Sequence, residues 1–401
     1  MTPPTQPGTS AGNLLLLVRQ GVATTRGELI RVTGLSRSTV TQRVDLLLDA
    51  GLLRESAGEA GGRGRPSGAL SFDEGGGHLL VALLHTAWAE LAVLDLGGRV
   101  LTRTSYPISI ADGPDPVLTE AAGRLDGLPA EAGLDPAGTV ALAVGVPGPV
   151  DVASGRAVQP PVMPGWHGHP VRDRLAERLG RPVYLENDAN LMALGEQRTN
   201  WPETSSLLLV TVGSGIGAGI VVDGRLYRGI DGGAGDIGHI RMHGRDERCA
   251  CGARGCLAAV ASGRALVRSL ADLGKDVTRA ADVRHLVQRG DADAVAAVRE
   301  AGRMVGEVLT TVVSVLNPEV LVLAGDIADT DGHFVSGVRE VLYQRSLPRA
   351  TQNLRVVTAG PGRSAAVAGA AELVLDEYFA PAAVDARLAG TTGRERGTSA
   401  P

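Results

Sequence analysis

Cysteine is scarce in this sequence, and its distribution is informative. Only three cysteines occur among 401 residues, Cys249, Cys251 and Cys256, and they lie within one short stretch. An odd and tightly clustered set excludes the disulfide framework of a small secreted protein. The cluster favours metal binding, with buried or redox-active thiols as the alternative.

Long hydrophobic runs are also missing. No stretch of about 18 apolar residues is present, so we expect no membrane span. The first dozen residues are rich in Pro, Thr, Gly and Ser and lack the basic and apolar pattern of a signal peptide. We therefore expect a cytoplasmic protein. Aromatic residues make up only 3%, yet hydrophobic residues reach 44%, which is enough to build the cores of two or three domains.

Positive charge is concentrated at one end of the chain. The net charge is −5, and Lys275 is the single lysine. Residues 1–70 nevertheless carry eight arginines against five acids, which gives +3 and leaves −8 for the remainder. A basic N-terminal region on an acidic body indicates that only this region meets a polyanion.

Residues 13–72 predict a winged helix-turn-helix DNA-binding domain, preceded by a disordered tail over 1–12. Thr25 and Glu28 have the spacing of a capping box, and Ser36 is placed to cap a third helix that ends near residue 50. Residues 54–71 are rich in Gly and Arg and predict a two-stranded wing. A three-helix module that binds another protein is the alternative.

The third helix and the wing carry residue types that suit DNA. Arginine pairs with guanine, glutamine with adenine, and hydroxyl groups hold phosphates. An arginine at the wing tip is suited to the minor groove. The candidate DNA contacts are Arg37, Ser38, Thr39, Thr41, Gln42, Arg43, Arg63 and Arg65.

The rest of the chain, residues 78–379, has the pattern of an α/β body with mostly parallel sheets, because short β-type runs alternate with helical stretches. A helix with apolar residues at helical spacing is expected over 294–316, and a disordered tail over 380–401. The expected strands are 79–84, 90–95, 139–146, 183–185, 207–212, 218–222 and 320–324.

The cysteines share a spacing pattern with a histidine. His239 precedes the cluster in the order His-x9-Cys-x-Cys-x4-Cys. One imidazole and three thiolates form a complete tetrahedral ligand set for zinc. Because four protein ligands leave no open position, the sequence predicts a structural zinc site at His239, Cys249, Cys251 and Cys256.

The body resembles the ROK family of repressors, open reading frames and sugar kinases. Five short motifs occur in the family's order, followed by the cysteine cluster. The motifs are residues 145–151, 164–166, 186–190, 213–219 and 235–239.

The resemblance implies a two-lobed, actin-like (ribonuclease H-like) ATPase-type fold and a sugar site. Asp188 stands where the family's kinases have the catalytic base, and Asn187 and His239 stand at sugar-contacting positions. Asp236 replaces the usual Glu, and Ala258 replaces another sugar-binding Glu, so the ligand fit is expected to differ.

The phosphate-binding loop of the kinases is degenerate here. The family's Asp-x-Gly-Gly-Thr aligns with residues 83–87, where Leu83 replaces the Asp, His85 and Thr86 the glycines, and Ala87 the Thr. The loop at 213–219 is retained, but Ala324-Gly325-Asp326 replaces a glycine run. We therefore expect no enzyme activity and interpret Asp188 as a vestigial base.

These features predict a transcriptional repressor that binds operator DNA and responds to a sugar or sugar phosphate. By resemblance it is a homodimer or homotetramer. The alternative is an active, ATP-dependent sugar kinase with a DNA-binding head.

Overall fold

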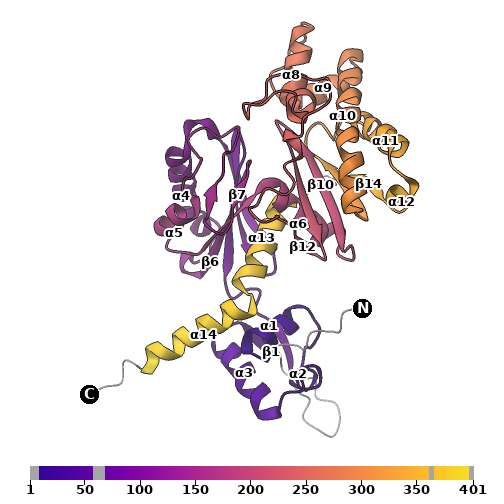
Figure 1. The fold of residues 1–401 in the computed structure, drawn as a ribbon. Coiled ribbons are helices and arrows are strands. Elements are labelled where there is room, and N and C mark those ends of the chain that lie inside the picture. The colour runs from indigo at the N-terminus through magenta and orange to yellow at the C-terminus, as the bar shows by residue number, and fades with distance from the viewer. Residues whose placement is uncertain (1–8, 57–67, 361–364, 397–401) are drawn as a thin grey trace.

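The structure is a computed structural model that describes residues 9–56, 68–360 and 365–396 (Figure 1). It has a small N-terminal head, residues 9–56 and 68–77, and two lobes that each contain a five-stranded sheet. The head consists of α1 (Ala11–Arg19), α2 (Arg26–Thr33), α3 (Arg37–Asp49), β1 (Leu53–Ser56) and β2 (Ala69–Phe72).

The helices of the head begin where the sequence provides caps. The side chains of Ser10, Thr25 and Ser36 each accept a hydrogen bond from the backbone N–H three residues later. Such caps satisfy amides that have no partner within the helix. Strands β1 and β2 pair antiparallel. The expected wing tip, with Arg63 and Arg65, lies outside the described residues.

The first lobe, residues 78–187, has the strand order β5-β4-β3-β6-β9. Strands β3, β6 and β9 run parallel, and β4 pairs antiparallel with both β3 and β5. One face of the sheet packs against α4 and α5. The elements are β3 (His78–Leu84), β4 (Trp88–Asp95), β5 (Val100–Pro107), α4 (Pro114–Glu131), β6 (Thr139–Val146), β7 (Val150–Asp151), β8 (Arg156–Ala157), α5 (Val171–Leu179) and β9 (Val183–Asn187).

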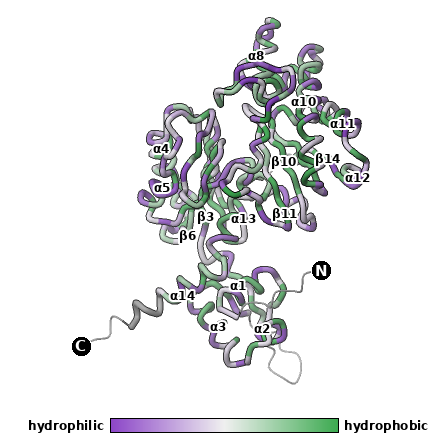
Figure 2. Tube along the Cα trace, viewed as in Figure 1, coloured by the Kyte–Doolittle hydropathy of each residue, from purple (hydrophilic) through white to green (hydrophobic). Residues whose placement is uncertain are grey.

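The second lobe, residues 206–358, has the strand order β12-β11-β10-β13-β14, and α10 and α11 cover one face. Figure 2 shows the apolar residues gathered along the strands and covering helices. The elements are β10 (Ser206–Val212), β11 (Ile216–Val222), β12 (Arg225–Leu226), η3 (Ile237–His239), α7 (Leu257–Ala261), α8 (Gly263–Asp272), α9 (Ala280–Gln288), α10 (Ala292–Leu316), β13 (Val320–Ala324), α11 (His333–Arg345), α12 (Pro348–Thr351) and β14 (Arg355–Thr358).

Two helices, α6 (Asp188–Asn200) and α13 (Ala365–Tyr378), pack together between the sheets. Their contact requires glycine. A Cβ atom on Gly195 would lie 1.8 Å from the carbonyl oxygen of Ala365, and one on Gly369 would lie 1.8 Å from that of Leu191. The two backbones therefore touch directly, and the helices form a tightly packed pair.

The predicted disorder over 380–401 is wrong for residues 381–396. They form α14 (Pro381–Arg396), which continues from α13 to the head (Figure 1). Val384 is fully buried, and the Gly12 N–H donates to the Asp385 carboxylate at 2.8 Å. Helix α1 also begins at Ala11, within the segment expected to be disordered. Contact between α1 and α14 holds these two helices together.

No helix of the described ranges is long and apolar enough to cross a membrane. The two-lobed α/β body predicted from the sequence is confirmed, and each expected strand is present. The edge strands β5 and β14 were not expected.

Candidate functional site

Three parallel strands of the first lobe bring the predicted sugar residues to one edge of the sheet. Leu83 of β3 lies beside Gly145 of β6, which lies beside Glu186 of β9. The carboxyl ends of parallel strands meet at the same edge, where α/β proteins place their ligands. Asn187 and Asp188 follow directly, at the start of α6.

Asn187 stabilises the local fold and also belongs to the candidate site. Its side-chain oxygen accepts from the backbone N–H groups of Ala189 (2.9 Å) and Asn190 (3.2 Å), and thereby caps α6. Its side-chain nitrogen donates to the carbonyl oxygen of Gly148 at 3.0 Å. Asn187 therefore fixes the loop after β6 against the start of α6, and one amide hydrogen remains for a ligand.

Asp188 is half-buried at the first position of α6. One carboxylate oxygen accepts from the Ala189 N–H at 2.8 Å. Desolvation raises the pKa of Asp188 from 3.8 to about 6, against the opposing effect of that hydrogen bond. A carboxylate with few protein partners is suited to accept hydrogen bonds from hydroxyl groups.

An ion pair between a buried glutamate and a half-buried arginine, which the sequence did not predict, links the lobes beside these residues. Glu186 is 1% exposed, and its carboxylate lies 2.6 Å from Nε of Arg228, which follows β12 in the second lobe. The other Glu186 oxygen accepts from the Asn187 N–H and from Nδ2 of Asn190, both at 2.9 Å. Glu186 therefore positions the Asn187–Asp188 segment and anchors it to the second lobe.

The second lobe contributes Asp236 and His239 through the short helix η3. A carboxylate oxygen of Asp236 lies 3.9 Å from Nε2 of His239. This is beyond hydrogen-bond distance. The segment comes close to β11: Gly235 has φ +96°, and a Cβ there would lie 2.1 Å from the carbonyl oxygen of Ala218. Only glycine allows this approach.

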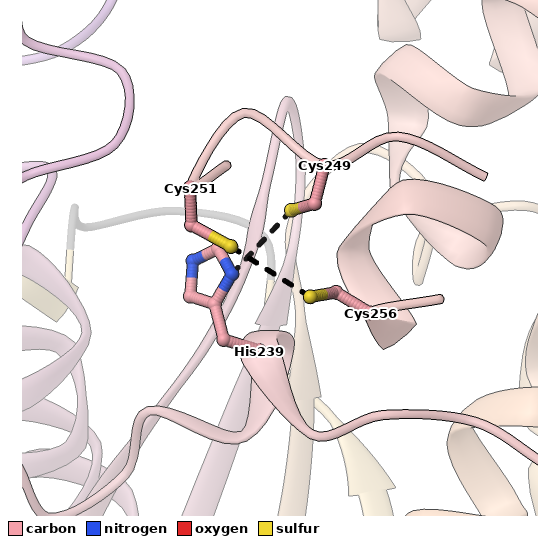
Figure 3. A group of neighbouring side chains, drawn as sticks. All are labelled: His239, Cys249, Cys251 and Cys256. Atoms are coloured by element: carbon pink, nitrogen blue, oxygen red, sulfur yellow. Dashed lines mark hydrogen bonds between the residues drawn. The ribbon is translucent and has the colours of Figure 1, made fainter. Parts of the chain in front are cut away.

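The four predicted metal ligands converge (Figure 3). Their ligand atoms all lie within 4.8 Å of one another. Sγ of Cys249 is 3.5 Å from Nδ1 of His239, and the sulfurs of Cys251 and Cys256 are 3.7 Å apart. Zinc–ligand bonds of about 2.0–2.3 Å imply tetrahedral edges of roughly 3.3–3.8 Å. The donor set and its spacing fit a zinc ion.

The two ring nitrogens of His239 face different groups. Because Nδ1 points to the cysteines, Nε2 faces Asp236. Zinc at the cluster would fix the tautomer and orientation of the imidazole. His239 therefore connects the metal cluster to the candidate sugar residues.

The segment predicted to replace the phosphate loop of the kinases, residues 83–87, spans the end of β3 and the turn before β4. Leu83 is 1% exposed and fills the space beside Gly145. The His85 ring stacks on Trp88 with centroids 4.0 Å apart and an interplanar angle of 21°. These positions therefore present apolar and aromatic groups at the turn.

The other altered positions are embedded in the second lobe. Ala258 packs against its core, and Asp326 lies 3.7 Å from Arg284. In the retained loop, the Gly213 N–H donates to the Gly215 carbonyl, and the Gly213 carbonyl accepts from Gly263. The loop glycines serve a tight strand connection in this fold.

The predicted DNA-contacting face of α3 is largely exposed. Arg37, Ser38, Thr41 and Gln42 are exposed, whereas Thr39 and Arg43 are half-buried. The buried side of α3 consists of Val40, Val44 and Leu47. Arg26 of α2 pairs with Asp45 of α3 and Glu55 of β1 and thereby joins three elements. The polar face of α3 is thus held in place by the packed core of the head and by these ion pairs.

A model of the ROK family matches residues 88–377. The chain belongs to the ROK family. Its similarity to a putative xylose repressor of Caldicellulosiruptor sp. (strain Rt8B.4) is 27% identity over 370 residues, which covers 88% of this chain and 92% of the relative.

Solved ROK structures resemble the chain to different extents. A ROK family transcriptional regulator, described as a homolog of the E. coli MLC protein, superposes with a TM-score of 0.80 at 27% identity, and the match covers 94% of this chain and 98% of that one. A ROK family glucokinase from Streptomyces griseus in complex with glucose and AMPPNP gives a TM-score of 0.65 at 26% identity and covers 74% of this chain and 99% of that one. The regulator match extends over more of this chain than the kinase match.

Proposed function

We propose that this protein is a sugar-responsive, DNA-binding transcriptional repressor. The observation that carries the proposal is the extent of similarity: a repressor and a regulator align with about nine-tenths of this chain, head included. A glucokinase aligns with 74% of this chain, a share similar to that of the body alone. The head is therefore the part that separates this chain from the kinases.

The proposed DNA-binding unit is a winged helix-turn-helix. Its support is the order of three helices and an antiparallel pair of strands, together with the exposed Arg37 and Gln42 at the start of α3. In this motif the N-terminal residues of the recognition helix contact base edges in the major groove. Two heads in a dimer would read a two-fold symmetric operator, and the oligomer is proposed to be a dimer or tetramer.

The proposed effector site joins residues of both lobes. Asp188 and Asn187 from the first lobe, with Asp236 and His239 from the second, provide the hydrogen-bonding groups that sugar hydroxyls require. Zinc bound by His239 and the three cysteines is proposed to hold this part of the second lobe in place and to supply no catalytic step. The name of the xylose-repressor relative makes xylose the first sugar to test.

A packed route joins the effector site to the head. Helix α6 begins at Asp188 and packs on α13, whose end contacts α1: Nη1 of Arg19 donates to the Leu375 carbonyl at 2.9 Å. The rings of Phe72 and Phe379 meet edge to face at 5.1 Å. A change in lobe arrangement would move α13 and hence the head. The effector changes DNA binding if it binds one lobe arrangement more tightly than the other.

The body is proposed to have lost phosphoryl transfer. Leu83 is buried and apolar at the position of the kinase acid, and the stacked His85 and Trp88 occupy the turn. Without that acid and the flexible glycines, the turn lacks the groups that hold the metal and the phosphates in line for transfer. The alternative, a kinase with a DNA-binding head, is favoured by one observation, the raised pKa of Asp188, which suits a general base.

One set of measurements tests the function. Fluorescence anisotropy of the chain's own upstream DNA should show saturable binding that is weakened by Arg37→Ala and unchanged by Arg124→Ala, which removes an exposed charge on α4. ADP release with hexoses and pentoses should stay at background and be the same for Asp188→Ala. Sequence-independent binding, or sugar-dependent ADP release that requires Asp188, would contradict the proposal.

A further inference from the structure

The turn between β3 and β4 presents an aromatic surface. It is closed by a hydrogen bond of 2.9 Å from the His85 N–H to the Trp88 carbonyl, and the two rings lie nearly parallel. Trp88 is 43% exposed, although its aromatic partner is half-buried. One face of the indole is therefore covered by His85, and the side chain retains a large accessible surface.

The strand register places this surface on the side of the sheet that faces the second lobe. Leu83 lies opposite Glu90 across the hairpin and beside Gly145, which in turn lies beside Glu186. Glu186 reaches the second lobe through Arg228. Because side chains two residues apart on a strand share a face, His85 and Trp88 continue the face of Leu83 and Glu90 toward the carboxyl edge.

Asp188 lies at the same edge, two strands from the end of β3 and three strands from Trp88 on β4. It follows Glu186 by two residues, as His85 follows Leu83. Neighbouring strands are about 4.8 Å apart, so β4, which begins at Trp88, is separated from β9 by roughly 14 Å. One sugar ring is too short to span that separation. A ring that is hydrogen-bonded to Asp188 therefore does not contact Trp88.

The chemistry of the turn suits a neutral carbohydrate. Burial lowers the pKa of His85 to about 4, so its ring is uncharged at neutral pH. The C–H groups on one face of a pyranose carry partial positive charge and pack on the electron-rich face of an aromatic ring. The turn offers no cation of its own for a phosphate, and Arg228 is already paired with Glu186. Asp188, at the same edge of the sheet, would repel an anion.

We propose that Trp88, backed by His85, is a second sugar subsite, and that the effector is a neutral disaccharide or longer saccharide. One ring hydrogen-bonds at Asp188, and the next stacks on Trp88. The subsite occupies the position at which the family's kinases bind phosphate. This inference rests on the proposed function, because it assumes that Asp188 belongs to an effector site, and it narrows the effector from any sugar or sugar phosphate to one class.

Isothermal titration calorimetry on the full chain tests the subsite. The probes are xylobiose, cellobiose and maltose, each compared with its monosaccharide, xylose or glucose. We expect at least one disaccharide to bind ten-fold or more tightly than its monosaccharide. Trp88→Ala should abolish that difference and leave monosaccharide affinity within two-fold, and Trp88→Phe should restore most of it. Tyr343→Ala, which removes an exposed aromatic ring on α11, is the matched control and should change neither affinity.

The outcomes separate the subsite from the wider function. Equal affinity for monosaccharides and disaccharides, or disaccharide affinity unchanged in Trp88→Ala, would overturn the subsite and leave a monosaccharide-responsive repressor. Binding of neither sugar size to the wild-type protein would overturn the effector site itself. Loss of folding in Trp88→Ala is detected by its unfolding midpoint, and Trp88→Phe then decides the question, because a merely structural role would leave the ratio of the two affinities unchanged.

Discussion

Buried Glu186 and half-buried Arg228 form an ion pair between the two lobes, with Oε2 and Nε 2.6 Å apart. Glu186 comes directly before the Asn187–Asp188 segment, and Arg228 comes directly before the glycine-rich segment that leads to Asp236. One ion pair therefore fixes the two halves of the proposed effector site relative to each other. Its geometry makes the lobe arrangement and the sugar site interdependent.

Removing the charge of Glu186 should weaken both the fold and the site. Glu186→Gln keeps the size of the side chain but leaves Arg228 without its carboxylate partner. We expect the free energy of unfolding to fall by about 2 kcal/mol, measured by urea denaturation, and sugar affinity to fall with it. Arg303→Gln, in a surface pair with Glu340, should cost less than about 1 kcal/mol. Equal effects of the two variants would show that the interlobe pair has no special role.

The cysteine cluster should bind one zinc ion per chain. Cys251→Ser removes one of four ligands, so we expect zinc content, measured by mass spectrometry, to fall toward zero and the unfolding midpoint to drop. Sugar affinity should also weaken, because His239 loses its fixed orientation. His243→Ala, a nearby histidine outside the cluster, should retain the metal. Full zinc content in Cys251→Ser would exclude that cysteine as a ligand.

Sugar binding should depend on the ionisation of Asp188. Desolvation raises its pKa to about 6, so the folded protein holds this proton at a pH where the unfolded chain has lost it. The stability contributed by the neutral form is therefore present at acidic pH and lost as pH rises through 6. The charged form is the better acceptor for sugar hydroxyls, so affinity should rise up to about ten-fold from pH 5 to pH 7. Titration calorimetry of Asp188→Asn should give a flat profile, and an equally steep profile would assign the effect to another group.

The C-terminal helix should stabilise the head. Val384 is fully buried where α14 packs on the head. Val384→Ala should destabilise this contact by about 2 kcal/mol and increase hydrogen exchange at the amides of α1. Val315→Ala, at an exposed position on α10, should leave exchange in α1 unchanged. Unchanged exchange in the Val384 variant would mean that α1 is ordered independently of α14.

Local sequence patterns predicted most of the fold. The strands β3, β6, β10 and β13 are nearly continuous runs of buried apolar residues, and Thr25 and Ser36 marked two helix starts correctly. The convergence of His239 and the three cysteines followed from spacing alone, because a short loop brings the cysteines together. Each of these signals lies within a few residues of the chain.

The features that were missed depend on distant contacts. Strand β5 is largely exposed, so it lacks an apolar pattern, and α14 is ordered by Val384 and Asp385 against the head. Arg228 is separated from Glu186 by 42 positions, and nothing near either residue indicates the other. No local pattern encodes these pairings, since they arise when the lobes and the chain ends assemble.

The central claim is that sugar binding at Asp188 controls DNA binding by α3. The most direct test is anisotropy of labelled upstream DNA in complex with the full chain while xylose, xylobiose, cellobiose or maltose is added. The account predicts that at least one sugar shifts operator affinity by five-fold or more, and that Asp188→Ala retains operator binding but no longer responds. Operator binding that no sugar alters, or a response that persists in Asp188→Ala, would contradict it.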